Sequence, residues 1–369
     1  MELSLLMKAF NVSGRLVTIN PTGNGNVNDT FLAIFRNTFA EEQVILQRVN
    51  HLVFPKPEAI MHNLRCLTAH VHPKLESEAD TADRVWQMPR IVKTRDGKDF
   101  FLDEAGEVWR VITKIASATA FDEAQNAEHA AECGAVLGHF HWLVSDLDTQ
   151  TMIDPLPGFH ITPGYLAKYD ATLADMPQAQ ERLTASMEAR RMAMFIEERR
   201  GFASTLQQAL DSGELTRRMM HGDPKVNNIM IDDFTGKGTA MIDLDTVSPG
   251  LIHYDFGDAL RSICNHAGED EQNLSKVVFD LDLCAAFCKG YMAHARSFLT
   301  EADRKYLYDA IRLITFELGL RFFQDYIAGS VYFKIRHPEQ NLNRARVQFR
   351  LCESIEARER PIRDLLAGL

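Results

Sequence analysis

The pattern of hydrophobic and polar positions divides the chain into a strand-rich first part and a helical remainder. A periodic segment that begins with proline predicts a helix over 57–70, and Asp96-Gly97 predicts a hairpin turn. Short apolar runs bounded by turn residues predict strands at 16–19, 30–35, 43–48, 90–94, 99–102 and 108–115. We therefore expect a small antiparallel sheet that carries one helix.

Beyond Ser117, apolar residues recur at the helical spacing of three and four. Thr162 and Pro163 predict a helix start, with Thr162 as the side-chain cap and proline at the first helical position. Long helical patterns cover 122–144, 178–210, 274–299 and 301–330. The segment 219–245 interrupts them, and its pattern predicts a loop, a strand, a turn and a second strand. We therefore expect an α+β chain with a sheet domain over 1–116 and a helical domain over 117–369.

Composition narrows the class of partner. Forty basic against fifty-one acidic residues give a net charge of −11, so neither nucleic acid nor an anionic membrane is an expected partner. The sequence has no uncharged apolar stretch of about 18 residues, the length that a membrane helix needs, and its start is too short and too acidic for a secretory signal. The six cysteines are scattered without a CxxC pair. We expect a reduced, cytoplasmic protein.

The segment that interrupts the helices carries the most informative polar residues. Asp223 is followed five residues later by Asn228 and twenty residues later by Asp243. Apolar runs at 229–231 and 240–242 predict a hairpin that returns Asp243 to the neighbourhood of Asp223. Phosphoryl transfer needs a carboxylate beside the attacking hydroxyl and oxygen ligands for magnesium. We therefore predict a kinase that uses ATP, with Asp223 as catalytic base and Asn228 and Asp243 as Mg²⁺ ligands.

The neighbours of this set receive more modest roles. We expect His221 to brace the loop backbone and Lys225 to reach a nucleotide phosphate, while Asp245 is either a second metal contact or a residue that holds the loop. Asp255-Phe256-Gly257 spells the metal-binding tripeptide of protein kinases. It opens a helix 32 residues after Asp223 instead of ending the hairpin, so we interpret Asp255 as a buried brace. His139 and His141 point to different faces of a helix and do not predict a metal site.

The first turn of the sheet is glycine-rich, which lets backbone amides approach phosphate oxygens; a plain hairpin is the alternative. Its expected nucleotide contacts are Gly23, Gly25, Asn26, Asn28 and Thr30. The third strand has Gln47 where kinases carry a phosphate-binding lysine. Arg48 points to the opposite face unless a bulge turns it. We expect ATP to lie near 113–115, with Lys114 among its contacts.

Taken together, these motifs resemble the aminoglycoside phosphotransferase-like kinases, which share the two-lobed protein-kinase fold, and more narrowly the N-acetylhexosamine 1-kinases. The sequence departs from the narrower pattern at Asn26, where that pattern has His. The segments that carry the resemblance are 23–30, 45–50, 53–57, 221–228, 242–247, 254–258, 321–326 and 331–333.

The resemblance implies Mg²⁺-dependent transfer of the ATP γ-phosphate to the anomeric hydroxyl of an N-acetylated hexose, which gives a sugar 1-phosphate. It also implies that Arg321 and Tyr332 line the sugar pocket beside Asp223, and that Gln47 is a trait of the subgroup. Two alternatives stay open. One is a kinase for an aminoglycoside, an amino alcohol or another metabolite. The other is a pseudokinase that binds nucleotide without transferring phosphate.

Overall fold

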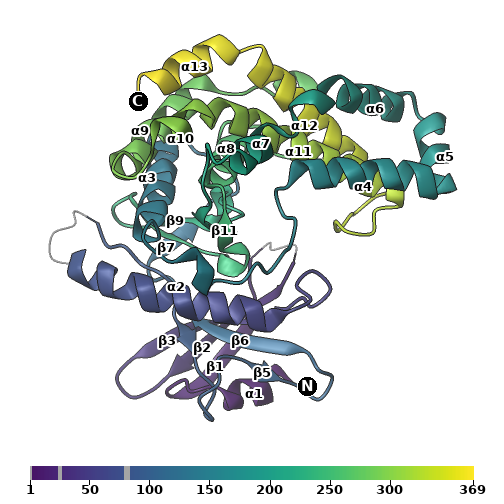
Figure 1. Cartoon of the computed structure of the whole chain (residues 1–369). Helices are drawn as coiled ribbons and strands as arrows, with labels where there is room; N and C mark the ends of the chain where they lie inside the picture. Colours follow the sequence, from purple (N-terminus) through teal and green to yellow (C-terminus); the bar gives the residue numbers. More distant parts are fainter. Residues whose placement is uncertain (1, 24–26, 79–83) are drawn as a thin grey trace.

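The computed structural model describes residues 2–23, 27–78 and 84–369. Its first part is an antiparallel sheet in the strand order β1-β2-β3-β6-β4, with β5 also paired to β6 (Figure 1). Helix α2 (Pro57–Glu78) lies between this sheet and the rest of the chain (Figure 1). The strands are β1 (Arg15–Pro21), β2 (Asp29–Arg36), β3 (Glu41–Val49), β4 (Ile91–Val92), β5 (Phe101–Leu102) and β6 (Val108–Thr113).

Side-chain alternation along β3 decides which residues face the rest of the chain. Val44 and Leu46 are fully buried in an apolar cluster with Leu6 and Phe10 of the N-terminal segment, which includes α1 (Leu3–Leu6) and the 3₁₀ turn η1 (Met7–Ala9). Gln47 therefore points to the other face. The register pairs Gln47 with Thr30 of β2 and with Arg110 of β6. Three polar side chains from three adjacent strands thus share that face.

The second part is mainly helical. Helices α3 and α9 approach so closely that a Cβ on Gly290 would lie 1.9 Å from the carbonyl oxygen of Ala131. None of the helices in the described ranges is long and apolar enough to cross a membrane. The central helices of this part are α3 (Ala127–Leu143), α8 (Ile252–Ile263), α9 (Leu281–Ala295), α10 (Glu301–Lys305), α11 (Leu307–Ala328), α12 (Gln340–Glu356) and α13 (Glu359–Ala367).

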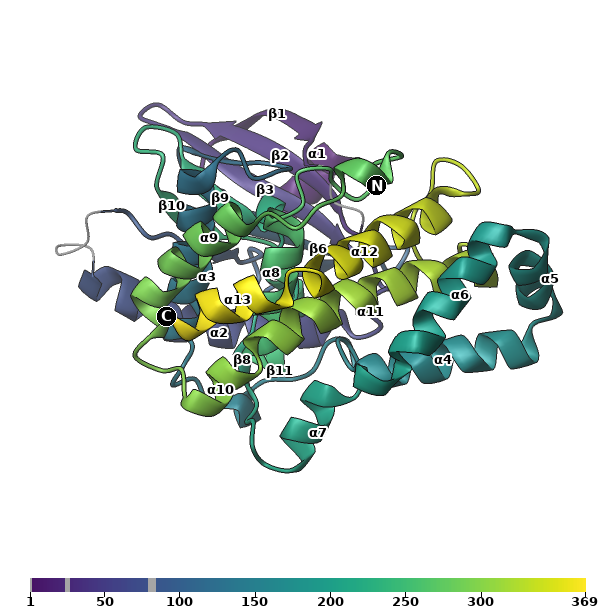
Figure 2. The same cartoon turned by 90° about the horizontal axis from the view of Figure 1, so that it is seen from above.

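A separate group of helices extends to one side of α11 and α12, away from the sheet lobe (Figures 1 and 2). It comprises α4 (Thr162–Asp175), α5 (Pro177–Ala185) and α6 (Met187–Arg199). The short α7 (Thr205–Asp211) instead packs against α8 and α11. The Phe195 ring of α6 stacks on Phe349 of α12 at 4.4 Å between centroids. The expected cap of α4 is wrong, because the Thr162 hydroxyl donates to Glu317 (2.6 Å) and leaves the helix start without a side-chain cap. Pro163 is in the first turn, as predicted.

Two small sheets interrupt the helices. The predicted hairpin is β9 (Ile229–Asp232) paired with β10 (Gly238–Met241), to which β7 (Ala118–Ala120) adds a third strand. β8 (Arg218–Met220) pairs with β11 (Ser248–Gly250). The sequence pattern indicated neither β7 nor β11, because three-residue strands carry too little periodicity. Residue 116 as the domain boundary stays a prediction.

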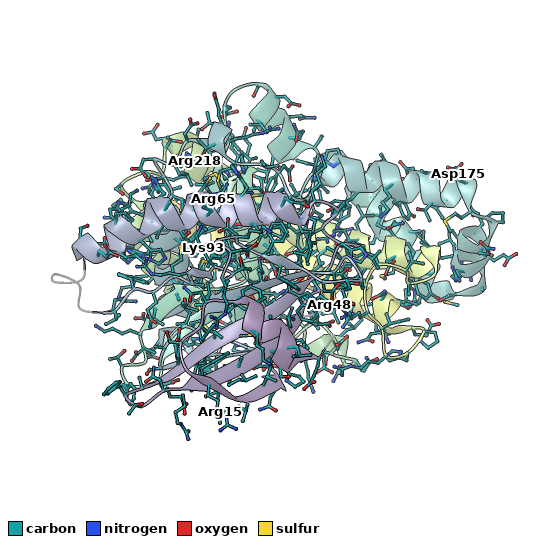
Figure 3. All side chains as sticks on the ribbon, turned by 90° about the horizontal axis from the view of Figure 1, so that it is seen from below. Arg15, Arg48, Arg65, Lys93, Asp175 and Arg218 are labelled. Atoms are coloured by element: carbon teal, nitrogen blue, oxygen red, sulfur yellow. The ribbon has the colours of Figure 1, made fainter. Side chains whose placement is uncertain are left out.

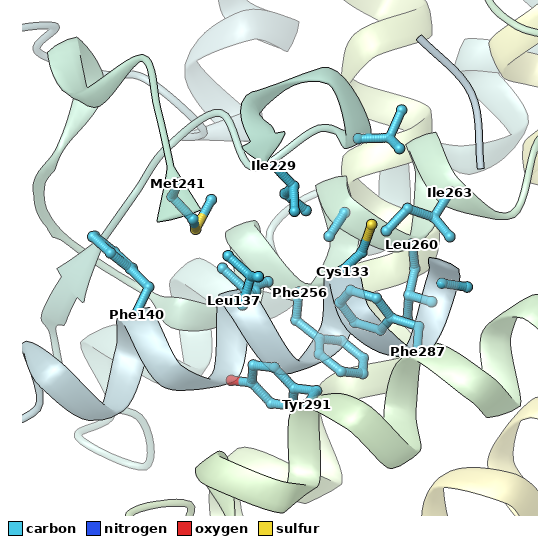
Figure 4. Packing of buried hydrophobic residues seen from close by; sticks show 14 of the residues in the cluster. Cys133, Leu137, Phe140, Ile229, Met241, Phe256, Leu260, Ile263, Phe287 and Tyr291 are labelled. Carbon is cyan, nitrogen blue, oxygen red and sulfur yellow. The ribbon is translucent and has the colours of Figure 1, made fainter. Parts of the chain in front are cut away.

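The hairpin is anchored by the main core of the helical lobe. Ile229 and Met241 are buried and lie close to Leu137 of α3 and to Phe256 and Leu260 of α8 (Figure 4). Burial of such side chains contributes roughly 1.5–3 kcal/mol each. The polar loops at the ends of β8, β9 and β10 therefore rest on a rigid base.

Most predicted elements are present, and their differences from the pattern lie at the ends. The strands at 16–19, 30–35 and 43–48 are each longer in the structure, and the first helix continues through Pro73 to Glu78. The pattern at 122–144 becomes helical only at residue 127, and that at 274–299 only at residue 281. The pattern at 178–210 is broken into α5, α6 and α7, and that at 301–330 into α10 and α11.

Candidate active site

The loop between β8 and β9 brings Asp223 and Asn228 together. The Asn228 side-chain amide donates to the carbonyl oxygen of Asp223 (2.8 Å) and to its carboxylate Oδ2 (3.0 Å). The backbone of Ile242 donates to the carbonyl of Asn228 (2.9 Å), which places Asp243 next to the loop, as the hairpin predicted. Asp223, Asn228 and Asp243 therefore form one polar group at the loop that follows β8.

Lys225 contacts this group from within the loop. Its ammonium nitrogen lies 2.7 Å from Oδ2 of Asp223. Burial alone would lower the pKa of Lys225, but the carboxylates of Asp223 and Asp243 outweigh burial and raise it above its usual range. Lys225 is thus a permanent cation beside the carboxylate that we expect to act as base.

Asp243 has an unusual backbone and an unusual charge environment. It adopts φ 62° and ψ 58°, a left-handed conformation that is uncommon for non-glycine residues, although Asp tolerates it better than most. Its side chain is open to solvent on one side. The surrounding protein nevertheless desolvates it, and together with repulsion from Asp245 and Asp223 this raises its pKa to about 7, although Lys225 and Arg110 act in the opposite direction. A cation bound here would relieve this repulsion.

The donor set fits magnesium only in combination with other oxygen ligands. Among the described residues, no three His, Cys, Asp or Glu side chains are grouped so that they could hold a metal ion by themselves. Magnesium in kinases is usually held by one or two carboxylates and completed by substrate phosphates and water. Asp243, with the side-chain oxygen of Asn228, fits such a partial set.

Asp255 supports the catalytic loop from behind. Its fully buried carboxylate accepts hydrogen bonds from the backbone amides of His221 (2.6 Å) and Gly222 (2.8 Å) and pairs with Nε2 of His141 (2.8 Å). Burial would raise the pKa of Asp255, but the hydrogen bond and charge of His141, with further contributions from His221, lower it below its usual value. Both oxygens are occupied by the loop and α3, so Asp255 is the brace that its helical position predicts.

His221 also contacts the backbone. Its Nε2 donates to the carbonyl of Ile242 (3.0 Å), and its Nδ1 accepts from the amide of Asp223 (3.3 Å). Burial lowers its pKa, which favours the neutral ring that these two bonds require. Gly222 follows with φ 87°, and a Cβ there would lie 2.9 Å from the carbonyl oxygen of Thr246. The tight turn therefore requires glycine at this position.

A buried histidine holds the other side of the loop. Nε2 of His160 lies 2.9 Å from the carbonyl oxygen of Gly222, and its Nδ1 lies 3.0 Å from Glu317 of α11. Burial opposes protonation of His160, but the hydrogen bond and charge of Glu317 outweigh it and raise its pKa. The helical extension and α11 are thus tied directly to the residue that precedes Asp223.

The polar face of the first sheet meets the hairpin through one connected network. The Gln47 side chain donates to the Thr30 hydroxyl (3.2 Å) and accepts from Nε and Nη2 of Arg110 (3.0 and 2.8 Å). Arg110 also pairs with Asp245 (2.5 Å), and Asp245 accepts from the amide of Asn28 (2.7 Å). Both carboxylate oxygens of Asp245 are thus used to hold the two parts together.

The other residues that we expected to contact the nucleotide differ in how far the structure places them near the site. Gly23 adopts φ 74° with open space around it, whereas Gly25 and Asn26 lie outside the described residues. The Lys114 ammonium donates to the carbonyl of Ile115 (3.1 Å), and none of its contacts among the described residues reaches the catalytic loop. Arg48, labelled in Figure 3, pairs with Asp29. The register of β3 has no bulge, so Arg48 lies on the opposite face from Gln47 and does not replace the missing lysine.

Arg321 lies in the second half of α11, and Tyr332 lies in the segment that follows this helix. The Arg321 guanidinium lies over three rings, those of Phe159 (5.1 Å), Tyr165 (5.1 Å) and Phe333 (5.6 Å). It makes no hydrogen bond or ion pair with any described residue. Phe159 precedes His160, and their rings lie 3.9 Å apart. Arg321 is therefore connected through two adjacent side chains to the loop that carries Asp223.

One carboxylate fixes the segment that carries Tyr332. Asp325 accepts hydrogen bonds from the backbone amides of Val331, Tyr332 and Phe333 (2.9–3.0 Å), and from the side chain of Asn341. Tyr332 itself is half exposed (49%). The loop presents its aromatic side chains from a rigid backbone.

Several residues that hold the site were not anticipated. The sequence indicates a structural or functional role for Arg110, since a charged residue in the middle of an apolar strand needs a partner. Asn63 of α2 donates to the carbonyl of Val247 (2.9 Å), and His160 and Glu317 join distant segments. His141, for which the sequence predicted no metal site, pairs with Asp255. The sequence pattern gave no indication of these tertiary contacts.

Comparison with known proteins agrees with this geometry. The family model of the phosphotransferase enzyme family matches residues 19–293. Similar solved structures include a microcompartment-associated aminopropanol kinase (17% identity, 98% of both chains, TM-score 0.56) and a spectinomycin phosphotransferase in complex with ADP and spectinomycin (10%, 97% of both, 0.60). A choline kinase from Cryptosporidium parvum is also similar (11%, 94% of this chain and 91% of that one, 0.57). The fold is the two-lobed fold of protein kinases, with a sheet lobe and a helical lobe.

Proposed function

Because the chain belongs to the phosphotransferase enzyme family, we propose that it transfers the γ-phosphate of ATP to a hydroxyl group of an N-acetylhexosamine. The coarser part, a kinase for a small molecule, follows from the family. The observation that supports it most strongly is the contact of Asp223 with Asn228 at the root of the hairpin that carries Asp243.

In this proposal Asp223 accepts the proton of the attacking hydroxyl. Lys225, 2.7 Å from Asp223, holds the carboxylate in place and adds positive charge where the transferred phosphate gains negative charge. Asn228 and Asp243 would hold Mg²⁺, which neutralises nucleotide phosphates when bound. Asp255 and His221 keep the loop fixed so that the carboxylate does not turn away.

The acceptor is inferred from Arg321. A guanidinium that makes no hydrogen bond or ion pair with any residue in the described ranges offers a planar fork of donors for hydroxyl or carbonyl oxygens, and the aromatic rings around it suit the apolar face of a sugar. The nearest acidic groups are already engaged, since Glu317 pairs with His160 and Asp258 with Arg261. The positive charge of an ammonium group would be repelled by Arg321, so a neutral polar acceptor fits better than choline or protonated aminopropanol.

Two other functions are weighed against this one. The amino-alcohol and aminoglycoside acceptors of similar proteins would place an ammonium group beside the Arg321 guanidinium, and Glu317 and Asp258 are already paired with other cations. A pseudokinase would be consistent with Gln47 in place of lysine. The complete Asp223, Asn228 and Asp243 set argues for turnover.

ADP release measured across a panel of acceptors tests the proposal. The panel contains N-acetylglucosamine, N-acetylgalactosamine, choline, ethanolamine, 1-amino-2-propanol and an aminoglycoside, each with ATP and Mg²⁺. We expect the highest kcat/KM with an N-acetylhexosamine, and Arg321→Met should raise the KM for that sugar while leaving the KM for ATP unchanged. Turnover only with amines would overturn the sugar assignment. Nucleotide binding without turnover on any acceptor would support the pseudokinase.

A further inference from the structure

Arg110 is a buried cation that has no place in the mechanism described above. It lies in β6, is 2% exposed and pairs with Asp245, two residues beyond Asp243. We propose that Arg110 binds the nucleotide phosphates in place of the lysine that kinases carry on the third strand. The inference rests on the proposed kinase function and on ATP as donor, but not on the identity of the acceptor.

The hydrogen-bond donors of Arg110 are only partly used. Nε and Nη2 donate to Gln47, and Nη2 also reaches Asp245. Nη1 is buried and has no hydrogen-bond partner among the residues that the structure describes. Buried donors are nearly always satisfied in folded proteins, so an exception calls for a missing partner. An anionic oxygen is the partner that a guanidinium satisfies best.

The position of Arg110 fits a phosphate. It lies opposite Gln47 in the strand register, on the same face of the sheet. Asp245, which it pairs with, also binds Asn28 at the end of the glycine-rich turn. The guanidinium is therefore in contact with groups that adjoin both the expected nucleotide loop and the expected metal ligand, which are the two features that flank the phosphates in kinases.

Gln47 then has a defined purpose. Its carbonyl oxygen accepts two donors from Arg110, and its amide reaches Thr30, so it orients the guanidinium. A lysine at this position would place a second cation beside Arg110 and remove the acceptor. In this proposal the positive charge that a lysine on β3 would supply comes instead from Arg110 on the neighbouring strand β6.

The competing explanation is that Arg110 and Asp245 only clasp the two lobes together. If the pair only holds the lobes together, its loss should weaken the binding of ADP and of adenosine equally, because both ligands need the same lobe arrangement. If Arg110 binds the phosphates, its loss should weaken the binding of ADP alone, since adenosine has no phosphate. The ratio of the two affinities therefore separates the explanations.

Isothermal titration of ADP and adenosine into wild type, Arg110→Met and the surface control Arg36→Met tests the inference. Arg36 is an exposed arginine of the same lobe, paired with Glu41. We expect Arg110→Met to weaken ADP binding by roughly tenfold to hundredfold, the value of one or two charged hydrogen bonds, with adenosine unchanged. Arg36→Met should change neither.

Equal losses for ADP and adenosine, or no loss for ADP, would overturn the inference. If Arg110→Met does not fold, the double variant Arg110→Gln/Asp245→Asn removes both charges of the buried pair and should show the same ADP-specific loss. A wild-type protein that binds neither nucleotide would instead count against the kinase function, so the two failures are distinguishable.

Discussion

Replacing Asp255 by Asn separates the two roles that its sequence context allows, a brace for the catalytic loop or a metal ligand. In the structure its two carboxylate oxygens serve the amides of His221 and Gly222 and the ring of His141. An asparagine keeps the shape of the side chain but has one acceptor oxygen. The change therefore removes charge and one acceptor without creating a cavity.

The expected loss of stability follows from the number of hydrogen-bond donors that Asp255 serves. In its better orientation, the Asn oxygen still serves His221 and His141, while the Gly222 amide faces an NH₂ group and loses its partner. One orphaned buried donor costs about 1–3 kcal/mol, and loss of charge weakens each remaining bond by about 1 kcal/mol. We therefore expect Asp255→Asn to lower the free energy of unfolding by about 3–5 kcal/mol, a large part of the roughly 5–15 kcal/mol typical of a folded protein.

Urea unfolding of both proteins, with kcat and the Mg²⁺ dependence measured in parallel, gives the test. We expect a fall in stability and kcat with an unchanged KM for Mg²⁺. Asp303→Asn is the control, since Asp303 is a buried carboxylate that pairs with Arg218 at the end of β8 opposite the catalytic loop; it should lower stability with little effect on kcat. A stability change below about 1 kcal/mol together with a raised Mg²⁺ requirement would refute the brace.

The pH dependence provides a second check on Asp255. Its pKa is lowered in the folded state, so its stabilising effect is complete above the usual carboxyl pKa and is lost as pH falls through the lower folded value. The stability difference between wild type and Asp255→Asn should therefore narrow only in acid, below about pH 4. A difference that is constant down to the acid transition would contradict this.

Three further predictions concern groups closer to the chemistry. Asp223→Asn should lower kcat by about 10²–10⁴-fold with the dissociation constant for ADP within about twofold by titration; near-normal turnover would exclude it as base. Because the pKa of Asp243 is raised to about 7, protons should compete with Mg²⁺ below that pH, and the KM for Mg²⁺ should rise by up to about tenfold per pH unit; a flat profile between pH 6 and 8 would contradict this. Asp325→Asn weakens three backbone contacts of the Tyr332 loop, so steady-state kinetics should show the KM for the acceptor rising about tenfold with that for ATP unchanged; equal changes in both would indicate general unfolding.

The parts of the site that could be predicted are local in sequence. Asp223, Asn228 and the hairpin that returns Asp243 lie within about twenty residues, and the spacing of apolar runs is enough to place them. The distinction between Asp243 and Asp255 also followed from local context, because one ends a strand and the other begins a helix.

The parts that could not be predicted depend on contacts between distant segments. His160 and Glu317 are 157 residues apart, and nothing in the local pattern of either indicates the other. The Thr162 cap was wrong for the same reason, since Glu317 competes for its hydroxyl. Arg110 could be predicted only in part. The sequence shows a charged residue inside an apolar strand, but it does not show that Asp245 is the partner.

The most direct test of the central claim is ³¹P NMR of the reaction of ATP and Mg²⁺ with N-acetylglucosamine or N-acetylgalactosamine, for wild type and Asp223→Asn. The account predicts loss of the γ-phosphate signal and growth of an acid-labile sugar 1-phosphate with wild type alone, and no product from the corresponding 1-deoxy sugar. Phosphate transferred to a different hydroxyl or only to an amine-bearing acceptor, or equal product from Asp223→Asn, would contradict it.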